Sequence, residues 1–116
     1  MNLDIAIHRE AAARYLHGNP EPVTSALMRC VQCALGDTGQ SRIVALGILS
    51  AYNGFRFKFD ISDLGALDEA AVRDLFQVWW LRHQGHEPHH FILNGGTVFE
   101  HIAEVWGFEQ DREAAA

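Results

Sequence analysis

The sequence predicts a mainly α-helical fold, built as a single compact domain of about five short helices. Apolar residues recur at three- and four-residue spacing over most of the chain, as on the buried face of amphipathic helices. Residues that cap or stop helices, chiefly Asp, Thr, Gly and Pro, separate these stretches. A chain of 116 residues with 48% hydrophobic content has room for one core. We therefore assign residues 1–110 to one helical domain and residues 111–116 to a frayed acidic tail.

The first two helices are predicted from composition and spacing. Residues 3–17 are rich in Ala and Leu, with charged residues interspersed, and predict a helix that ends near Gly18. A second helix begins after Pro22 and ends near Gly36, because apolar residues repeat at helical spacing between them. Its apolar stripe consists of Val23, Leu27, Cys30, Val31 and Ala34.

A polar turn over residues 36–42 separates the second helix from the third. Asp37 and Gln40 have the spacing of a capping box, so the third helix is expected to begin at about Thr38. Apolar residues then follow at helical spacing as far as Tyr52, and Asn53-Gly54 supplies the stop. The second and third helices are therefore expected to form a tight hairpin.

One short two-stranded β element is also compatible with the sequence. Residues 55–59 alternate phenylalanine with a basic residue, which is the period of an extended segment with one buried face. Residues 90–93 are the other candidate strand, and we expect 55–59 to pair with 90–93.

The remaining helices are predicted from their caps. Residues 62–64 can form a single helical turn, after which Asp68 caps a longer helix that ends at Gly85. Thr97 and Glu100 have the spacing of a second capping box, and predict a last helix that packs by its apolar face.

The charge of the chain favours a protein partner with a basic surface. The net charge is −6, and the nine Lys and Arg residues are scattered, so no basic stripe is available to follow a phosphate backbone. Direct nucleic-acid binding is therefore disfavoured. Two adjacent tryptophans on one helix cannot both point into the core, and an arginine at a helix start can hold an acidic group. The predicted partner-binding residues are Asp63, Asp68, Glu69, Asp74, Trp80 and Arg42.

The sequence predicts a cytoplasmic protein without a membrane span. The longest apolar run, residues 43–52, is much shorter than a bilayer requires, and no secretory signal is visible at the start. The two cysteines are expected to be reduced thiols, because two cysteines in a domain with a core of this size do not make a disulfide framework.

No catalytic residue and no cofactor are predicted. The chain contains no nucleophile elbow, P-loop or dinucleotide-binding glycine motif. Residues 86–90 match the letters of the zinc-protease motif H-E-x-x-H. Because Pro88 is tolerated only in the first turn of a helix, His86 and His90 cannot share a regular helical face there.

A looser metal site is the alternative function. Four histidines lie within eight positions and could hold zinc in a structural or regulatory site: His83, His86, His89 and His90. Cys30 and Cys33 have the spacing of a metal-binding or redox pair, but they lie in the middle of a predicted helix, where Cys30 is on the apolar stripe. Ordinary core and surface roles for all of these residues also stay open.

Several motifs give the chain a family resemblance. They are the run Ala34-Leu35-Gly36-Asp37-Thr38-Gly39-Gln40-Ser41-Arg42, then Phe59-Asp60-Ile61-Ser62-Asp63-Leu64, then Leu67-Asp68. With these motifs, residues 23–107 resemble an uncharacterised family of small domains found on phages, plasmids and integrative elements. The resemblance implies a mobile-element setting and transfers no catalytic residue.

The function expected from these observations is that of a small, acidic, non-catalytic protein-binding module of a mobile genetic element. Its sharpest form is an inhibitor of a host defence complex, in the manner of anti-CRISPR proteins. The alternative is a zinc-binding structural or regulatory domain that uses the histidine loop. A homodimer is compatible with either, if a tryptophan is exposed.

Overall fold

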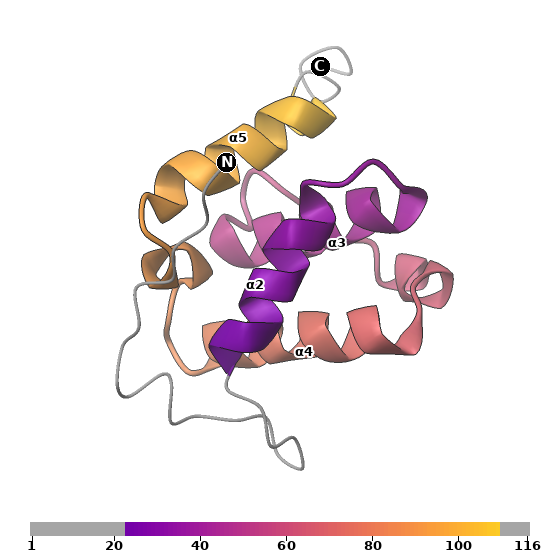
Figure 1. Ribbon diagram of the computed structural model, residues 1–116, viewed down its shortest axis with the longest axis horizontal. Coiled ribbons are helices and arrows are strands. Elements are labelled where there is room, and N and C mark those ends of the chain that lie inside the picture. The colour runs from indigo at the N-terminus through magenta and orange to yellow at the C-terminus, as the bar shows by residue number, and fades with distance from the viewer. Residues whose placement is uncertain (1–22, 110–116) are drawn as a thin grey trace.

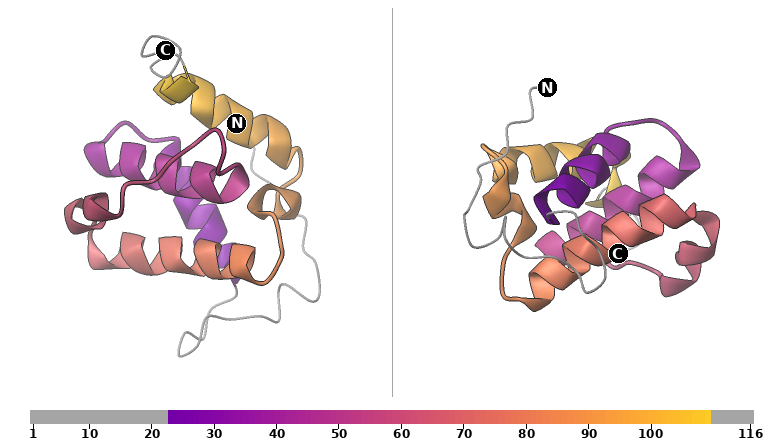
Figure 2. Two further views of the ribbon diagram at one scale, coloured as in Figure 1. Left: turned by 180° about the vertical axis from the view of Figure 1, so that it is seen from behind. Right: turned by 60° about the horizontal axis from the view of Figure 1, so that its bottom comes forward.

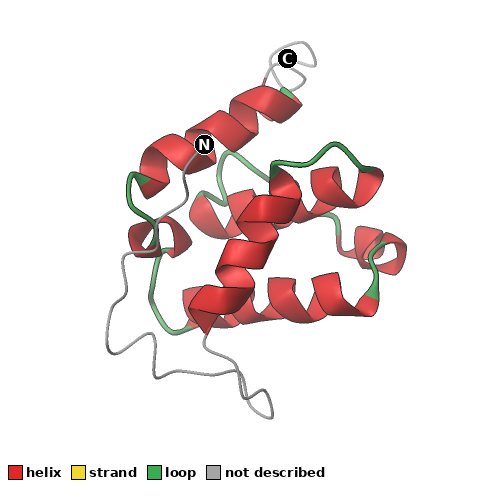
Figure 3. Cartoon of the chain, viewed as in Figure 1, coloured by secondary structure: helices red, strands yellow, loops and turns green. Residues whose placement is uncertain are grey.

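A computed structural model describes residues 23–109, and the fold of this part is helical. Its four α-helices are α2 (Val23–Ala34), α3 (Gly39–Tyr52), α4 (Glu69–His83) and α5 (Gly95–Trp106). Two 3₁₀-helices, η1 (Ile61–Ala66) and η2 (Pro88–Phe91), precede and follow α4. The prediction of a mainly α-helical compact domain is confirmed (Figure 3). The helix expected over residues 3–17 and the tail over 111–116 lie outside the described residues.

The helices pack around one core. Helix α2 contacts both α3 and α4, and α3 also contacts α5. Figure 1 shows α2 crossing in front of α3, with α4 along the lower edge and α5 along the upper edge. The short helix η2 lies between the ends of α4 and α5, and contacts both as well as α3. The largest fully buried side chains come from every one of these helices except η1: Leu27, Ile48, Leu49, Leu75, Leu81, Phe91, Phe99 and Ile102.

Two helix starts differ from their predicted caps. The N-cap of α3 is Thr38, whose side chain accepts from the amide of Ser41, so Asp37 is not the capping residue. The N-cap of α5 is Asn94 in a left-handed conformation without a side-chain hydrogen bond, and the predicted box of Thr97 with Glu100 is absent. The cap of α4 by Asp68 is confirmed, because its carboxylate accepts from the amide of Ala71 at 2.8 Å.

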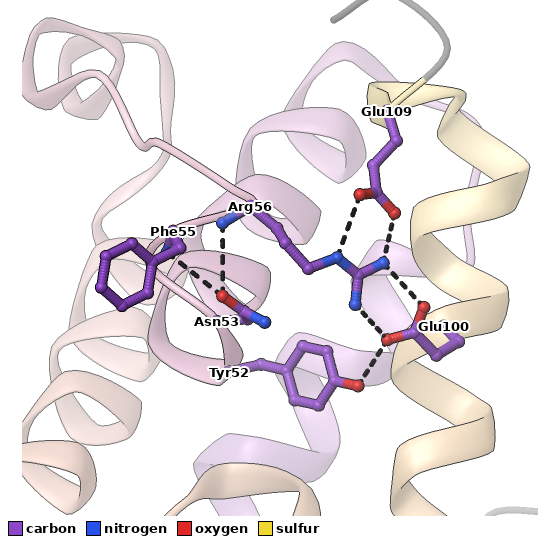
Figure 4. Close-up of polar contacts among 6 residues, drawn as sticks. All are labelled: Tyr52, Asn53, Phe55, Arg56, Glu100 and Glu109. Atoms are coloured by element: carbon purple, nitrogen blue, oxygen red, sulfur yellow. Dashed lines mark hydrogen bonds and ion pairs between the residues drawn. The ribbon is translucent and has the colours of Figure 1, made fainter. Parts of the chain in front are cut away.

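The predicted two-stranded β element is wrong. Neither 55–59 nor 90–93 forms a strand. After α3, the side chain of Asn53 accepts hydrogen bonds from the amides of Phe55 and Arg56, and this turn takes up the amides that a ladder would need (Figure 4). Residues 90 and 91 belong to η2, which starts at Pro88. The phenylalanine alternation therefore reflects a folded-back loop, in which Phe57 is 2% exposed and Phe55 is 90% exposed.

The path of this loop is visible from behind. Figure 2, left, shows the segment after α3 crossing the face of the molecule between α3 and α4 before it reaches η1. The loop therefore places its side chains next to the outer surface of α4. Among residues 23–109, no helix has both the length and the apolar character to span a membrane.

Candidate functional site

The polar turn before α3 is held by internal hydrogen bonds. Oε1 of Gln40 accepts from the backbone amide of Asp68 at 2.7 Å, and Nε2 of Gln40 donates to the Asp68 carboxylate at 3.2 Å. These bonds join the start of α3 to the start of α4. The hydroxyls of Thr38 and Ser41 lie 2.9 Å apart at the same helix start. The most distinctive motif of the sequence thus closes the helical core.

The predicted acidic residues lie in different environments. Asp63 lies in η1, and Asp68 and Glu69 lie at the start of α4, so these three follow one another along one exposed stretch. The carboxylate of Asp74 makes two hydrogen bonds of 2.8 Å with the guanidinium of Arg29 on α2, and only 16% of its side chain is exposed. Asp74 therefore ties two helices together and is not part of the open acidic stretch.

The other two predicted binding residues lie apart from the acids. The guanidinium of Arg42 stacks over the ring of Phe108, 5.1 Å from its centroid. Trp80 is half-buried and packs on the ring of His83 at 5.1 Å. The structure therefore does not bring Arg42 and Trp80 into one surface with Asp63, Asp68 and Glu69.

An apolar groove lies where the loop after α3 crosses α4. It has a volume of about 310 Å³ and is lined by Ser50, Ala51, Phe59, Ile61, Trp79 and Arg82. Trp79 is anchored there, because its indole nitrogen donates to the carbonyl of Gly47 at 3.2 Å. The side chain of Ile61 is 66% exposed at the edge of the groove. We refer to these six residues as the apolar groove.

Sequence reasoning missed this groove. Phe59 packs edge-on against Trp79 with ring centroids 5.2 Å apart, and was expected in a strand. Ile61 was passed over as the start of a helical turn. The only signal available was an isoleucine between two acids, at a position where η1 buries no residue.

A charged network joins the same loop to α5 (Figure 4). Arg56 binds the carboxylate of Glu100 with two hydrogen bonds of 2.6 and 2.8 Å, and also binds Glu109 in a two-pronged contact. Tyr52 donates its hydroxyl to Glu100. In Figure 4, Arg56 reaches toward α5 while the ring of Phe55 points away from it. The network thus fixes the base of the loop and leaves Phe55 outside.

The network shifts the ionisation of its members. The hydrogen bonds from Arg56, helped by that of Tyr52, lower the pKa of Glu100 to about 2, although partial burial opposes the shift. Burial and the bond to Glu100 raise the pKa of Tyr52. Glu100 therefore stays charged and Tyr52 stays protonated at neutral pH, which suits a structural link.

The histidine loop forms a second cluster at the other end of α4. Nε2 of His90 lies 3.2 Å from Oε2 of Glu87, and Nε2 of His89 lies 3.9 Å from the same oxygen. These three residues each offer one ligand atom, and the three atoms lie within 4.8 Å of one another. His83 is not a member of this cluster, since its ring packs on Trp80. A pocket of about 500 Å³ beside the cluster is lined by Arg82, Gly85, His86, Glu87, His90 and Phe91.

The two cysteines are separate thiols. Cys30 is buried in the core, and burial raises the pKa of its thiol. Cys33 is half-buried, with its sulfur 4.0 Å from the hydroxyl of Ser41. Among the described residues, neither cysteine belongs to a group of three metal-ligating side chains.

Fold and surface together define a small helical domain with one apolar groove and one histidine cluster. The model of a family of unknown function, DUF7673, matches residues 24–107, so the chain belongs to this family. No curated protein and no solved structure matches the chain.

Proposed function

We propose that this protein is a non-catalytic binding module that takes a basic segment of a partner protein. In this proposal, one apolar side chain of the segment enters the apolar groove, and Lys or Arg residues beside it contact the acidic stretch. The observation that carries the proposal is the exposure of Ile61 next to a groove walled by Phe59 and Trp79. Aromatic side chains around a small cleft are typical anchors of protein interfaces.

Charge complementarity decides the kind of partner. Asp60 and Asp63 flank Ile61 in the chain, and Asp68 and Glu69 follow at the start of α4. Hydrogen bonds from the hydroxyl and amide of Ser62 lower the pKa of Asp60, so this carboxylate stays charged. An exposed apolar side chain among carboxylates suits a segment in which an apolar residue has basic neighbours.

Arg82 gives the groove a polar end. It lines both the apolar groove and the pocket beside the histidine cluster. A carboxylate, or a backbone carbonyl, of the bound segment can accept from its guanidinium. The proposed partner segment therefore has a direction, with its basic residues toward η1 and an acceptor group toward the end of α4.

The resemblance to mobile-element domains favours a partner from host or element machinery. Inhibition of a host defence complex is the sharpest form of the proposal. Cytoplasmic location belongs to the same proposal, because such complexes work there.

The test is a selection of random twelve-residue peptides displayed on phage against the immobilised full chain. The proposal predicts a consensus of one large apolar residue flanked by Lys or Arg. Ile61→Asp and Asp63→Lys should each weaken the selected peptides by about tenfold or more, because each removes a contact worth about 1.4 kcal/mol. Val105→Asp is the matched control, since Val105 is 56% exposed on α5 and lies outside the groove.

Two results would contradict the proposal. One is a selection without an apolar and basic consensus, or with peptides that bind Ile61→Asp and Val105→Asp equally. The other is a concentration-dependent dimer, measured by sedimentation equilibrium, that Ile61→Asp dissociates and Val105→Asp does not. That result would assign the groove to a second copy of the chain.

A further inference from the structure

The histidine loop has a geometry that its sequence spacing does not predict. Pro88 starts η2, and this turn brings Glu87, His89 and His90 together at one edge of it. Oε2 of Glu87 lies 3.2 Å from Nε2 of His90 and 3.9 Å from Nε2 of His89. Zinc binds nitrogen and oxygen at about 2.0–2.2 Å, so ligand atoms around a tetrahedral ion lie about 3.4 Å apart. The observed separations bracket that value.

His89 is held in position by its surroundings. Its ring packs edge-on against Tyr52 with centroids 4.8 Å apart, and lies 6.2 Å from the ring of Phe99. The backbone is fixed as well, because a Cβ on Gly95 would lie 1.8 Å from the His89 carbonyl oxygen. Tyr52 is itself bonded to Glu100. The imidazole is therefore presented by packed elements on both sides.

Only one nitrogen of His89 is open to a ligand. Nδ1 is enclosed and has no hydrogen-bond partner, so Nε2 is the nitrogen that faces Glu87. Burial, with a smaller contribution from His90, lowers the pKa of His89. The ring is consequently neutral at neutral pH, which is the form that binds metal ions.

We propose that Glu87, His89 and His90 bind a divalent transition-metal ion, with Zn²⁺ the expected ion. Two imidazoles and one carboxylate suit zinc, nickel and copper, whereas magnesium and calcium prefer oxygen ligands throughout. Three protein ligands leave a fourth position, and the pocket of about 500 Å³ beside Glu87 and His90 gives it access. Water or a small anion near Arg82 completes the coordination. This ligand set contains Glu87 and omits His83.

The test uses the untagged full chain after treatment with EDTA. Titration with ZnCl₂ at pH 7.5, followed by calorimetry, should show one ion per chain with a Kd of about 10 μM or tighter. Titration with CoCl₂ should produce the visible absorption of a four-coordinate cobalt site. Affinity should fall as pH is lowered below about 6, because the imidazoles must lose their protons to bind.

Variants locate the ion. His90→Ala and Glu87→Gln should each weaken zinc binding by about tenfold or more. Both side chains are largely exposed, so circular dichroism should show an unchanged fold. His83→Ala and His101→Ala are the matched controls, and should bind zinc as the wild type does. Absence of binding at 100 μM zinc, about ten times the expected Kd, would overturn the proposal. Equal losses in His90→Ala and either control would overturn it as well.

Discussion

The turn over residues 36–42 and the loop over residues 55–61 both follow a helix, yet they use their side chains in opposite ways. In the turn, Thr38 and Gln40 bond to the starts of α3 and α4. In the loop, Phe55 and Ile61 are exposed. The first amides of a helix lack partners within the helix, so polar residues at its start are used for capping. An irregular loop has no such demand, and can carry an apolar residue outward for binding.

The comparison changes which motif should be connected with function. A distinctive polar sequence at a helix start reports the needs of folding first. The side chains available to a partner are in the segment that the sequence made look like an ordinary strand. The histidine loop combines both characters, since His89 is packed on one side while His90 is exposed on the other.

The largest expected effect concerns the packed side of the histidine loop. Gly95→Ala should destabilise the protein by about 3 kcal/mol, because the added methyl group meets the backbone of His89 and neither element can yield easily. Gly96→Ala is the matched control: nothing lies within 4 Å of its Cβ position, and alanine should stabilise the helix by up to about 1 kcal/mol. Urea unfolding of both variants measures the difference. Equal stabilities would mean that the loop is not packed as described.

The polar turn should come next. Thr38→Ala with Gln40→Ala should lower the free energy of unfolding by about 2 kcal/mol, since one helix cap and the link to α4 are lost. Asp37→Ala should change it by less than about 0.5 kcal/mol, because Asp37 is exposed and does not cap α3. A larger loss in Asp37→Ala than in the double variant would restore the predicted capping box and break the comparison.

The base of the loop should give a smaller, pH-dependent effect. The pKa of Glu100 is lowered in the folded protein to about 2, from a model value of 4.5. Its stabilising contribution is therefore complete above about pH 5 and is lost as pH falls through 2. Because 45% of the side chain is exposed, solvent screening limits the contribution to about 1 kcal/mol. Glu100→Gln should flatten the curve of unfolding free energy against pH between 5 and 2, and an unchanged curve would contradict the network.

The smallest expected change is in the stability of the groove variant. Ile61→Asp should alter the free energy of unfolding by less than about 0.5 kcal/mol, because the side chain is mostly in solvent already. Thermal unfolding with Val105→Asp alongside measures this. A loss of more than about 2 kcal/mol would show that Ile61 holds the fold and is not a free binding residue.

The sequence predicted the parts of the fold that depend on local pattern. The ends of α2 and α3 follow from helical periodicity and stop residues, and the Asp68 cap of α4 follows from its spacing. The caps of α3 and α5 were misassigned because a choice between neighbouring candidates depends on tertiary contacts. Gln40 was expected to reach back to its own helix, but it bonds to Asp68, 28 positions away.

The site was less predictable for the same reason. Period two in residues 55–59 indicated a strand, and only the Asn53 turn and the lack of a partner show why none forms. The two carboxylates that hold Arg56 come from 44 and 53 positions away. Of the four histidines expected in a metal site, the structure places His89 and His90 together and supplies Glu87, which was considered only as a catalytic base.

The most direct test of the central claim compares two indole N–H signals during a peptide titration. The tightest peptide from the display selection is added to ¹⁵N-labelled protein. Trp79, whose indole bonds to Gly47, reports on the groove, and Trp106, whose indole bonds to the carbonyl of Ala34 before the polar turn, reports on the motif side. We predict a saturable shift of the Trp79 indole and of the amides near Ile61, with Trp106 and residues 38–42 unmoved. A shift confined to Trp106 and residues 38–42 would contradict the account.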